Sequence, residues 1–207
     1  MRNIFLKRKK RFHKNNQGFT LVELLVVFFI MASILAVVIP GYLEYSTKLD
    51  LENLALDVAL TVREAQSYGA GAKVSTSGSG SFNATYGINF DLNNSNKFFF
   101  FEENGSLGYD NGIDFLINEY TVKNGYSLYD VCLSDGGNKE CNKKGNDVRG
   151  TVIYFTRPNP DAIIYRRNNG GNIIGGPWES ASLEFISPDQ ATTTVQIRKT
   201  GAISILR

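Results

Sequence analysis

Histidine is almost absent from this chain of 207 residues. The one histidine, His13, lies near the start, ahead of any residues that could fold into a domain. Serine and cysteine nucleophiles usually depend on a histidine base, so this absence argues against Ser-His and Cys-His catalysis. The glycine-rich stretch 69–73 lacks the spacing of a phosphate-binding loop and predicts a helix end instead. We therefore expect a protein that is not an enzyme and that holds no cofactor.

Cysteine is scarce as well. Cys132 and Cys141 are the only two, with eight residues between them in a segment rich in Gly, Asn and Lys. Two cysteines without a neighbouring histidine make a poor zinc site, so we expect no metal there. Their state depends on the compartment, because an oxidising one favours a disulfide and a reducing one favours free thiols.

Acidic residues are missing from the first stretch, where none precedes Glu23. This leader holds seven of the 22 Lys and Arg residues: Arg2, Lys7, Arg8, Lys9, Lys10, Arg11 and Lys14. The rest of the chain therefore has 15 basic residues against 20 acidic ones, although the formal net charge of the whole is +2. A mildly acidic body argues against a strongly nucleic-acid-binding domain.

A long apolar run follows the leader, from Phe19 to Ile39, with Glu23 as its one charge. Twenty-one residues in a helix span about 32 Å, which is enough to cross the hydrocarbon core of a bilayer. A carboxylate inside a membrane costs on the order of 3 kcal/mol, so Glu23 is a functional candidate.

The residues around Gly18 resemble the processing site of type IV prepilins and type II secretion pseudopilins. The matching stretch is KNNQGFTLVEL, residues 14–24. The resemblance implies that prepilin peptidase cuts between Gly18 and Phe19 and that Phe19 becomes the methylated N-terminus. It also implies that Glu23 pairs with the terminal amine of a neighbouring subunit during assembly, since opposite charges attract strongly in a low-dielectric setting. Pro40 matches a proline common in the family, where it kinks or locally melts the helix.

Two simpler interpretations remain beside this one. A secretory signal peptide also has a basic start and an apolar segment, but it is cut after that segment, and residues 39–42 are a poor site for that cut. A plain single-pass anchor explains the length and the basic flank, yet it leaves Gly18 and Glu23 unexplained.

The helix is predicted to continue to about Tyr68, so that residues 19–68 span roughly 75 Å if unbroken. Its second half is predicted to be amphipathic. The apolar face comprises Leu51, Leu54, Ala55, Val58, Val62 and Ala65. We divide the chain into a leader (1–18), a transmembrane and filament-core helix (19–40), its amphipathic continuation (41–70) and a β-rich head (71–207).

The head is predicted to consist of many short strands. They are expected at 86–90, 97–102, 113–122, 126–133, 152–156, 162–166, 182–187, 192–198 and 202–206, the last two forming a hairpin. Ser75–Ser81 is predicted to be a flexible linker, Asn104–Gly105 a turn and Arg157–Asp161 a rigid turn. Asp91 to Glu102 faintly resembles a calcium loop, but Asn96 replaces the usual glycine, so a hairpin turn is the better interpretation.

The fold class we expect is α+β, with the long helix packed on an antiparallel, sandwich-like head. The order of the helix, the Tyr86–Phe90 strand and a terminal hairpin resembles the H-type minor pseudopilins and their minor pilin relatives. Residues 63–66 near the end of the helix share this looser resemblance.

The two resemblances together imply a structural filament subunit. It would be anchored in the inner membrane by a single pass, with a cytoplasmic leader and an external head, where Cys132 and Cys141 would form a disulfide. Its partners would be prepilin peptidase, membrane lipid before assembly, the inner-membrane assembly platform and other pilin or pseudopilin subunits, in an extracellular or periplasmic filament.

Two other roles remain open at this point. One is that of a type II secretion minor pseudopilin. The other is that of a minor pilin that captures DNA, for which the candidate contacts are Arg166, Arg167, Arg198 and Lys199. A basic group of this size is more often a solvated surface, so nucleic-acid binding is the weaker hypothesis.

Overall fold

The computed structural model describes residues 18–71, 73–76, 84–105, 107–123, 125–142 and 148–206. The chain divides into two compact units, Met1–Glu44 and Tyr45–Arg207, and each is described by itself. Residues 1–17 of the predicted leader and residues 77–81 of the predicted linker lie outside the described residues.

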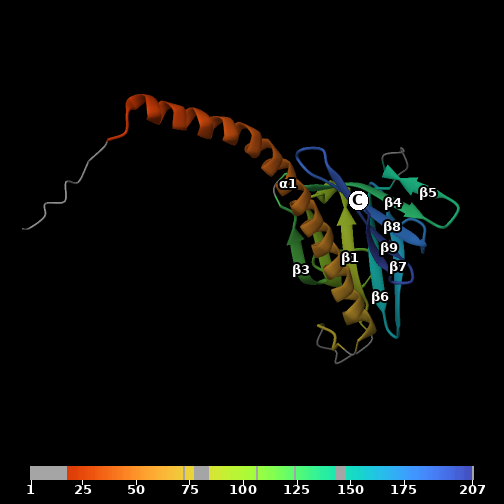
Figure 1. Cartoon of the computed structure of the whole chain (residues 1–207). Helices are drawn as coiled ribbons and strands as arrows, with labels where there is room; N and C mark the ends of the chain where they lie inside the picture. The colour runs from red at the N-terminus through yellow and green to blue at the C-terminus, as the bar shows by residue number, and fades with distance from the viewer. Residues whose placement is uncertain are drawn as a thin grey trace, which may run out of the picture. The chain divides into compact units, whose positions relative to one another are not determined.

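One long helix, α1 (Leu21–Ala70), passes through both units (Figure 1). It begins two residues later and ends two residues later than predicted. Thr20 precedes its first turn, and the Thr20 Oγ1 accepts a hydrogen bond of 3.2 Å from the backbone N–H of Glu23. The sequence Thr-x-x-Glu is that of a capping box, which satisfies free N–H groups at a helix start. The other end closes where Gly71 N donates to Ser67 O at 2.9 Å.

Within the second unit, α1 buries the face that its periodicity predicts. Ala55, Val58, Val62 and Ala65 are fully buried and Leu51 nearly so, while Leu54 packs partly buried against the same core. Gly69 allows the end of the helix to approach strand β6 (Gly150–Thr156) closely, because a Cβ at this position would come within 2.5 Å of the Phe155 Cβ. Helix packing therefore depends on small residues near its end as well as on the apolar stripe.

The described residues form two sheets of five strands each, and all strand pairings within them are antiparallel (Figure 1). The first sheet has the order β3-β2-β1-β6-β7, with strands β1 (Tyr86–Asp91), β2 (Lys97–Glu102), β3 (Phe115–Thr121), β6 (Gly150–Thr156) and β7 (Asn159–Arg167). The second sheet has the order β10-β9-β8-β4-β5, with strands β4 (Ser127–Ser134), β5 (Lys139–Cys141), β8 (Ser180–Ile186), β9 (Thr192–Arg198) and β10 (Ile203–Leu206).

A single core joins α1 to the inner faces of both sheets. Period-two alternation places every second residue of each strand on this side. The first sheet contributes Ile88, Phe90, Phe98, Phe100, Ile153, Phe155 and Ile164, and the second contributes Val131, Leu133, Leu183, Phe185, Val195 and Ile197. The predicted α+β class, with a long helix on an antiparallel sandwich-like head, is confirmed.

Most predicted strands are found with small shifts at their ends, and the hairpin of β9 and β10 is confirmed by the pairing of Ile203 with Ile197. The rigid turn is shorter than predicted, because β7 already starts at Asn159. Pro160 therefore lies in a strand, which is tolerated because β7 is the edge of its sheet. Asn104–Gly105 opens a long connection between β2 and β3 rather than a tight hairpin.

Two elements were missed. β5 was predicted as loop, since Lys139–Cys141 is too short to show alternation. The 3₁₀ turn η1 (Leu92–Asn94) follows Asp91, whose Oδ1 accepts from Asn93 N at 2.8 Å. Asp91 Oδ2 also lies 3.4 Å from Arg167 Nη1, so this carboxylate takes part in a turn and an ion pair. These contacts agree with the hairpin interpretation of residues 91–97.

Candidate processing and assembly site

The predicted cleavage site lies immediately before α1. Gly18 and Phe19 have no regular structure, and Phe19 is 81% exposed. An ideal Cβ at Gly18 would meet nothing within 4 Å. Within the described residues, the backbone at this bond is therefore open to an enzyme, and nothing local demands a glycine.

Glu23 lies in the first turn of α1, where the free N–H groups of the helix carry partial positive charge. It is the one acidic residue in that turn, and its surroundings on the helix are aliphatic and aromatic. Thr20 fixes the backbone of this turn, because its Oγ1 accepts a hydrogen bond from Glu23 N. Thr20 was not singled out from the sequence, although the capping-box pattern Thr-x-x-Glu could have indicated this role. The turn therefore presents one carboxylate beside the residue that would become the N-terminus.

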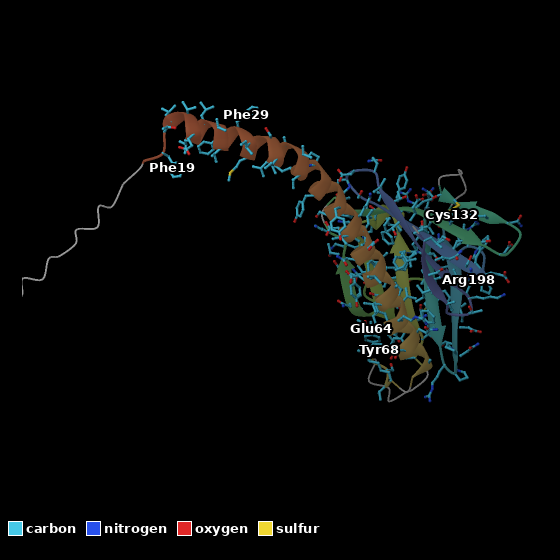
Figure 2. All side chains as sticks on the ribbon, in the orientation of Figure 1. Phe19, Phe29, Glu64, Tyr68, Cys132 and Arg198 are labelled. Atoms are coloured by element: carbon cyan, nitrogen blue, oxygen red, sulfur yellow. A yellow bond between two sulfur atoms is a disulfide. The ribbon has the colours of Figure 1, made fainter. Side chains whose placement is uncertain are left out.

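The helix beyond Glu23 exposes apolar side chains on all sides (Figure 2). Phe28, Phe29 and Val37 are 64%, 72% and 79% exposed, and α1 is long and apolar enough to cross a membrane by length and composition. A soluble surface rarely carries so large a continuous apolar area, so this segment requires lipid or another protein around it.

Pro40 lies inside α1, which is continuous through this position. The family resemblance implied that Pro40 kinks or locally melts the helix, and of these two effects a melted turn is not found at Pro40. Proline lacks an N–H group, so the carbonyl of Ala36 has lost its helical donor even though the helix continues.

The cysteines form the predicted disulfide, with Cα atoms 4.1 Å apart. Cys132 and Cys141 lie directly opposite each other in the pairing of β4 with β5. The bond thus closes the hairpin at the edge of the second sheet. Among the described groups, Asp130 lies near both sulfur atoms, but sulfurs bonded to each other do not act as thiolate ligands.

The four candidate nucleic-acid contacts do not share one set of partners. Arg166 forms an ion pair with Glu140 of β5, and Arg167 Nη1 donates to Asn89 Oδ1 at 2.6 Å and lies 3.4 Å from Asp91 Oδ2. Lys199 Nζ lies 2.5 Å from Glu179 Oε1. Arg198 is exposed at the end of β9. Three of these cations are thus already matched by carboxylates, which reduces the charge they can offer to phosphate.

Comparison with known proteins finds a match for the N-terminal segment. Residues 13–39 match the family model of the prokaryotic N-terminal methylation motif, which is the type IV prepilin and pseudopilin signature. The N-terminal segment of the chain thus carries the signature of type IV pilin-like and pseudopilin-like proteins. The motif implies processing by a peptidase and assembly with other pilin subunits, and together with the apolar helix it fits membrane anchoring before assembly. No curated protein and no solved structure matches the chain.

Proposed function

We propose that this chain is a structural subunit of a type IV pilus-like filament. Prepilin peptidase removes residues 1–18 and methylates Phe19. Residues 19–40 then anchor the subunit in the inner membrane and later form the filament core, residues 41–70 carry the head on the same helix, and residues 71–207 complete the external head. The observation that carries the proposal is the match at residues 13–39 to a methylation motif, followed by a helix whose apolar surface stays exposed among the described residues.

Glu23 is the assembly residue in this proposal. Cleavage creates an ammonium group at Phe19, and a carboxylate of the adjacent subunit neutralises it where little water remains. The contact joins two different surfaces, so it repeats without closing and yields a helical filament. Pro40 would adjust the helix where it leaves the filament core.

Intact mass and N-terminal sequencing of the protein from its native host test the processing step. We expect a start at a methylated Phe19. Gly18→Val should leave the full-length precursor in the membrane, while the control Gly41→Ala, at another glycine with open space around it, should be processed normally. A wild-type protein that starts at Met1, or beyond Pro40, would exclude the filament role.

Assembly is tested separately. Glu23→Leu should be cleaved and methylated yet yield no filaments, and Glu23→Asp should restore part of the assembly because it keeps the carboxylate. Filaments of normal number and length in Glu23→Leu cells would remove Glu23 from the mechanism.

The same subunit architecture also suits a type II secretion pseudopilus, and the alternative function is therefore that of a minor pseudopilin. Filaments containing this protein that can be sheared from cells would support the pilus. A protein that stays in the envelope, and whose loss blocks export of secreted proteins, would support the pseudopilus.

A further inference from the structure

The outer face of the first sheet is not an ordinary solvated surface. It carries a second apolar cluster in which Phe101, Val152 and Tyr154 are fully or almost fully buried. Residues from two long connections, Tyr109 between β2 and β3 and Ile173 between β7 and β8, pack against it. A sheet face covered in this way by loops provides a rigid floor with walls, which is the usual setting of a binding site.

Beside this cluster lies a hollow of about 380 Å³ with a buried polar floor. Asn89, in the middle of β1, is only 2% exposed. Its Oδ1 accepts from Arg167 Nη1 at 2.6 Å, which fixes the plane of the amide. Asn89 lines the hollow, and an amide held in this way presents a polar group of fixed orientation to whatever fills it.

The position of Arg167 follows from the register of three strands. Gly150 of β6 pairs with Asp91 of β1 on one side and with Arg167 of β7 on the other. Arg167 thus lies one strand away from Asp91, and its guanidinium spans the middle strand and reaches both Asp91 and Asn89. Arg167 Nε also donates to Gly171 O at 3.0 Å, so its side chain is held in place.

The charges around the hollow are balanced. Arg167 pairs with Asp91, and Lys97 Nζ lies 2.5 Å from Glu119 Oε1 across β2 and β3. Nucleic acids bind mainly through unpaired Lys and Arg that neutralise phosphates, and this wall offers none of that kind among the described residues. A neutral ligand fits the balance better than a polyanion.

The remaining wall is aromatic. Phe99 and Tyr109 stack with ring centroids 4.8 Å apart and ring planes within 12° of parallel. Amide and hydroxyl-binding groups surround these rings, with Asn94 and Asn111 exposed at the rim. Sugars combine apolar C–H faces, which suit aromatic rings, with hydroxyl edges that suit planar amide, carboxylate and guanidinium groups.

We propose that this hollow binds a neutral oligosaccharide. Tyr109 also lines a second hollow of about 390 Å³ together with Gly171 and Asn172, so both hollows share this aromatic side chain. In this arrangement Asn89 and Arg167 hold hydroxyl groups on the floor, and Asn94 and Asn111 hold them at the rim. The site gives the head a ligand of its own, in addition to any role in a filament.

The test uses the full chain in detergent micelles with three neutral trisaccharides, maltotriose, cellotriose and N,N′,N″-triacetylchitotriose, and binding is followed by saturation-transfer NMR and calorimetry. We expect at least one of them to bind with a dissociation constant of about 1 mM or lower. Asn94→Ala/Asn111→Ala should raise that constant about tenfold, because both rim hydrogen bonds are lost. Both residues are exposed, so this variant should keep its fold, which circular dichroism can verify.

The matched control is Asn118→Ala, which removes an exposed asparagine of β3 that does not line the hollow and should leave binding unchanged. Three results would overturn the proposal. They are the absence of binding by all three sugars, equal binding by the rim variant, and binding of a short oligothymidine that the rim variant loses, which would make the site one for single-stranded nucleic acid.

Discussion

Gly87 of β1 lies beneath the ring of Phe101, and a Cβ at this glycine would come within 2.6 Å of the Phe101 Cζ. The same Cβ would lie 2.8 Å from Cε1 of Tyr154 on the other neighbouring strand. The two rings meet above the glycine edge to face, with centroids 6.0 Å apart. The outer cluster of the first sheet therefore exists because β1 has no side chain at this position.

Gly87→Ala should destabilise the head for this reason. Even one methyl group forces two buried rings aside, and overpacking of this kind costs about 1–3 kcal/mol. Urea denaturation of the full chain in detergent, followed by Trp178 fluorescence, measures the free energy of unfolding of the head. Gly137→Ala is the control, since a Cβ there meets nothing within 4 Å, and its effect should be small. Equal effects of the two substitutions would mean that the rings can move freely.

Removal of the disulfide should also weaken the head. Cys132 and Cys141 enclose eight residues, and a loop of this size contributes about 2–3 kcal/mol in the chain-entropy description. Cys132→Ser/Cys141→Ser should unfold at correspondingly lower urea, and a reducing agent should shift the wild type toward the variant without changing the variant. A wild type that is insensitive to reduction would show that the β4–β5 hairpin is held by its other contacts.

The two faces of α1 in the second unit should respond differently to truncation. Val58 is fully buried in the core, so Val58→Ala should cost about 2 kcal/mol in unfolding free energy through lost burial and an unfilled cavity. Leu56 is 50% exposed, and Leu56→Ala should change stability by less than about 0.5 kcal/mol. Thermal unfolding of the two variants under the same conditions measures both losses of stability. A larger loss in Leu56→Ala than in Val58→Ala would contradict the assignment of the buried face.

Periodic patterns made much of the fold predictable. Tyr86–Phe90 alternates because one face of β1 meets the core, and residues 51–65 repeat at helical spacing because α1 lies on the same core. The start of α1 was predicted from residues 14–24, where a glycine, a carboxylate and an apolar run occur together. Each of these patterns lies within a short stretch of sequence, so it can be recognised without knowledge of the tertiary structure.

The outer face of the first sheet could not be predicted in this way. Phe101 and Tyr154 meet only because β1 separates β2 from β6, and Arg167 reaches Asn89 only because β6 lies between β7 and β1. These contacts depend on strand order and register, which no short stretch of sequence contains. The basic group was misleading for the same reason, because Glu140 and Asp91, the partners of Arg166 and Arg167, are distant in sequence.

Glu103 should make the stability of the head depend on pH. Burial raises the pKa of Glu103 above its ordinary value of 4.5, and the nearby carboxylates of Asp114 and Asp110 raise it further, while the hydrogen bond from Tyr154 opposes them. The folded protein therefore holds this proton more tightly than the unfolded chain. By linkage, the stabilising effect of the neutral form is fully present below pH 4.5 and is lost as the pH rises through the folded pKa.

Glu103→Gln removes this titration while keeping an oxygen that can accept from Tyr154 Oη, which lies 2.8 Å from Glu103 Oε2. The unfolding free energy of the wild type, measured in urea relative to this variant, should fall between pH 4.5 and neutral pH. Tyr154→Phe should steepen that fall, because the hydrogen bond it deletes lowers the pKa of Glu103. Two results would contradict this prediction. A difference in unfolding free energy between wild type and Glu103→Gln that stays constant with pH would show that the Glu103 carboxylate is well solvated in the folded head. A difference that grows in favour of the wild type at neutral pH would show that this carboxylate is well paired.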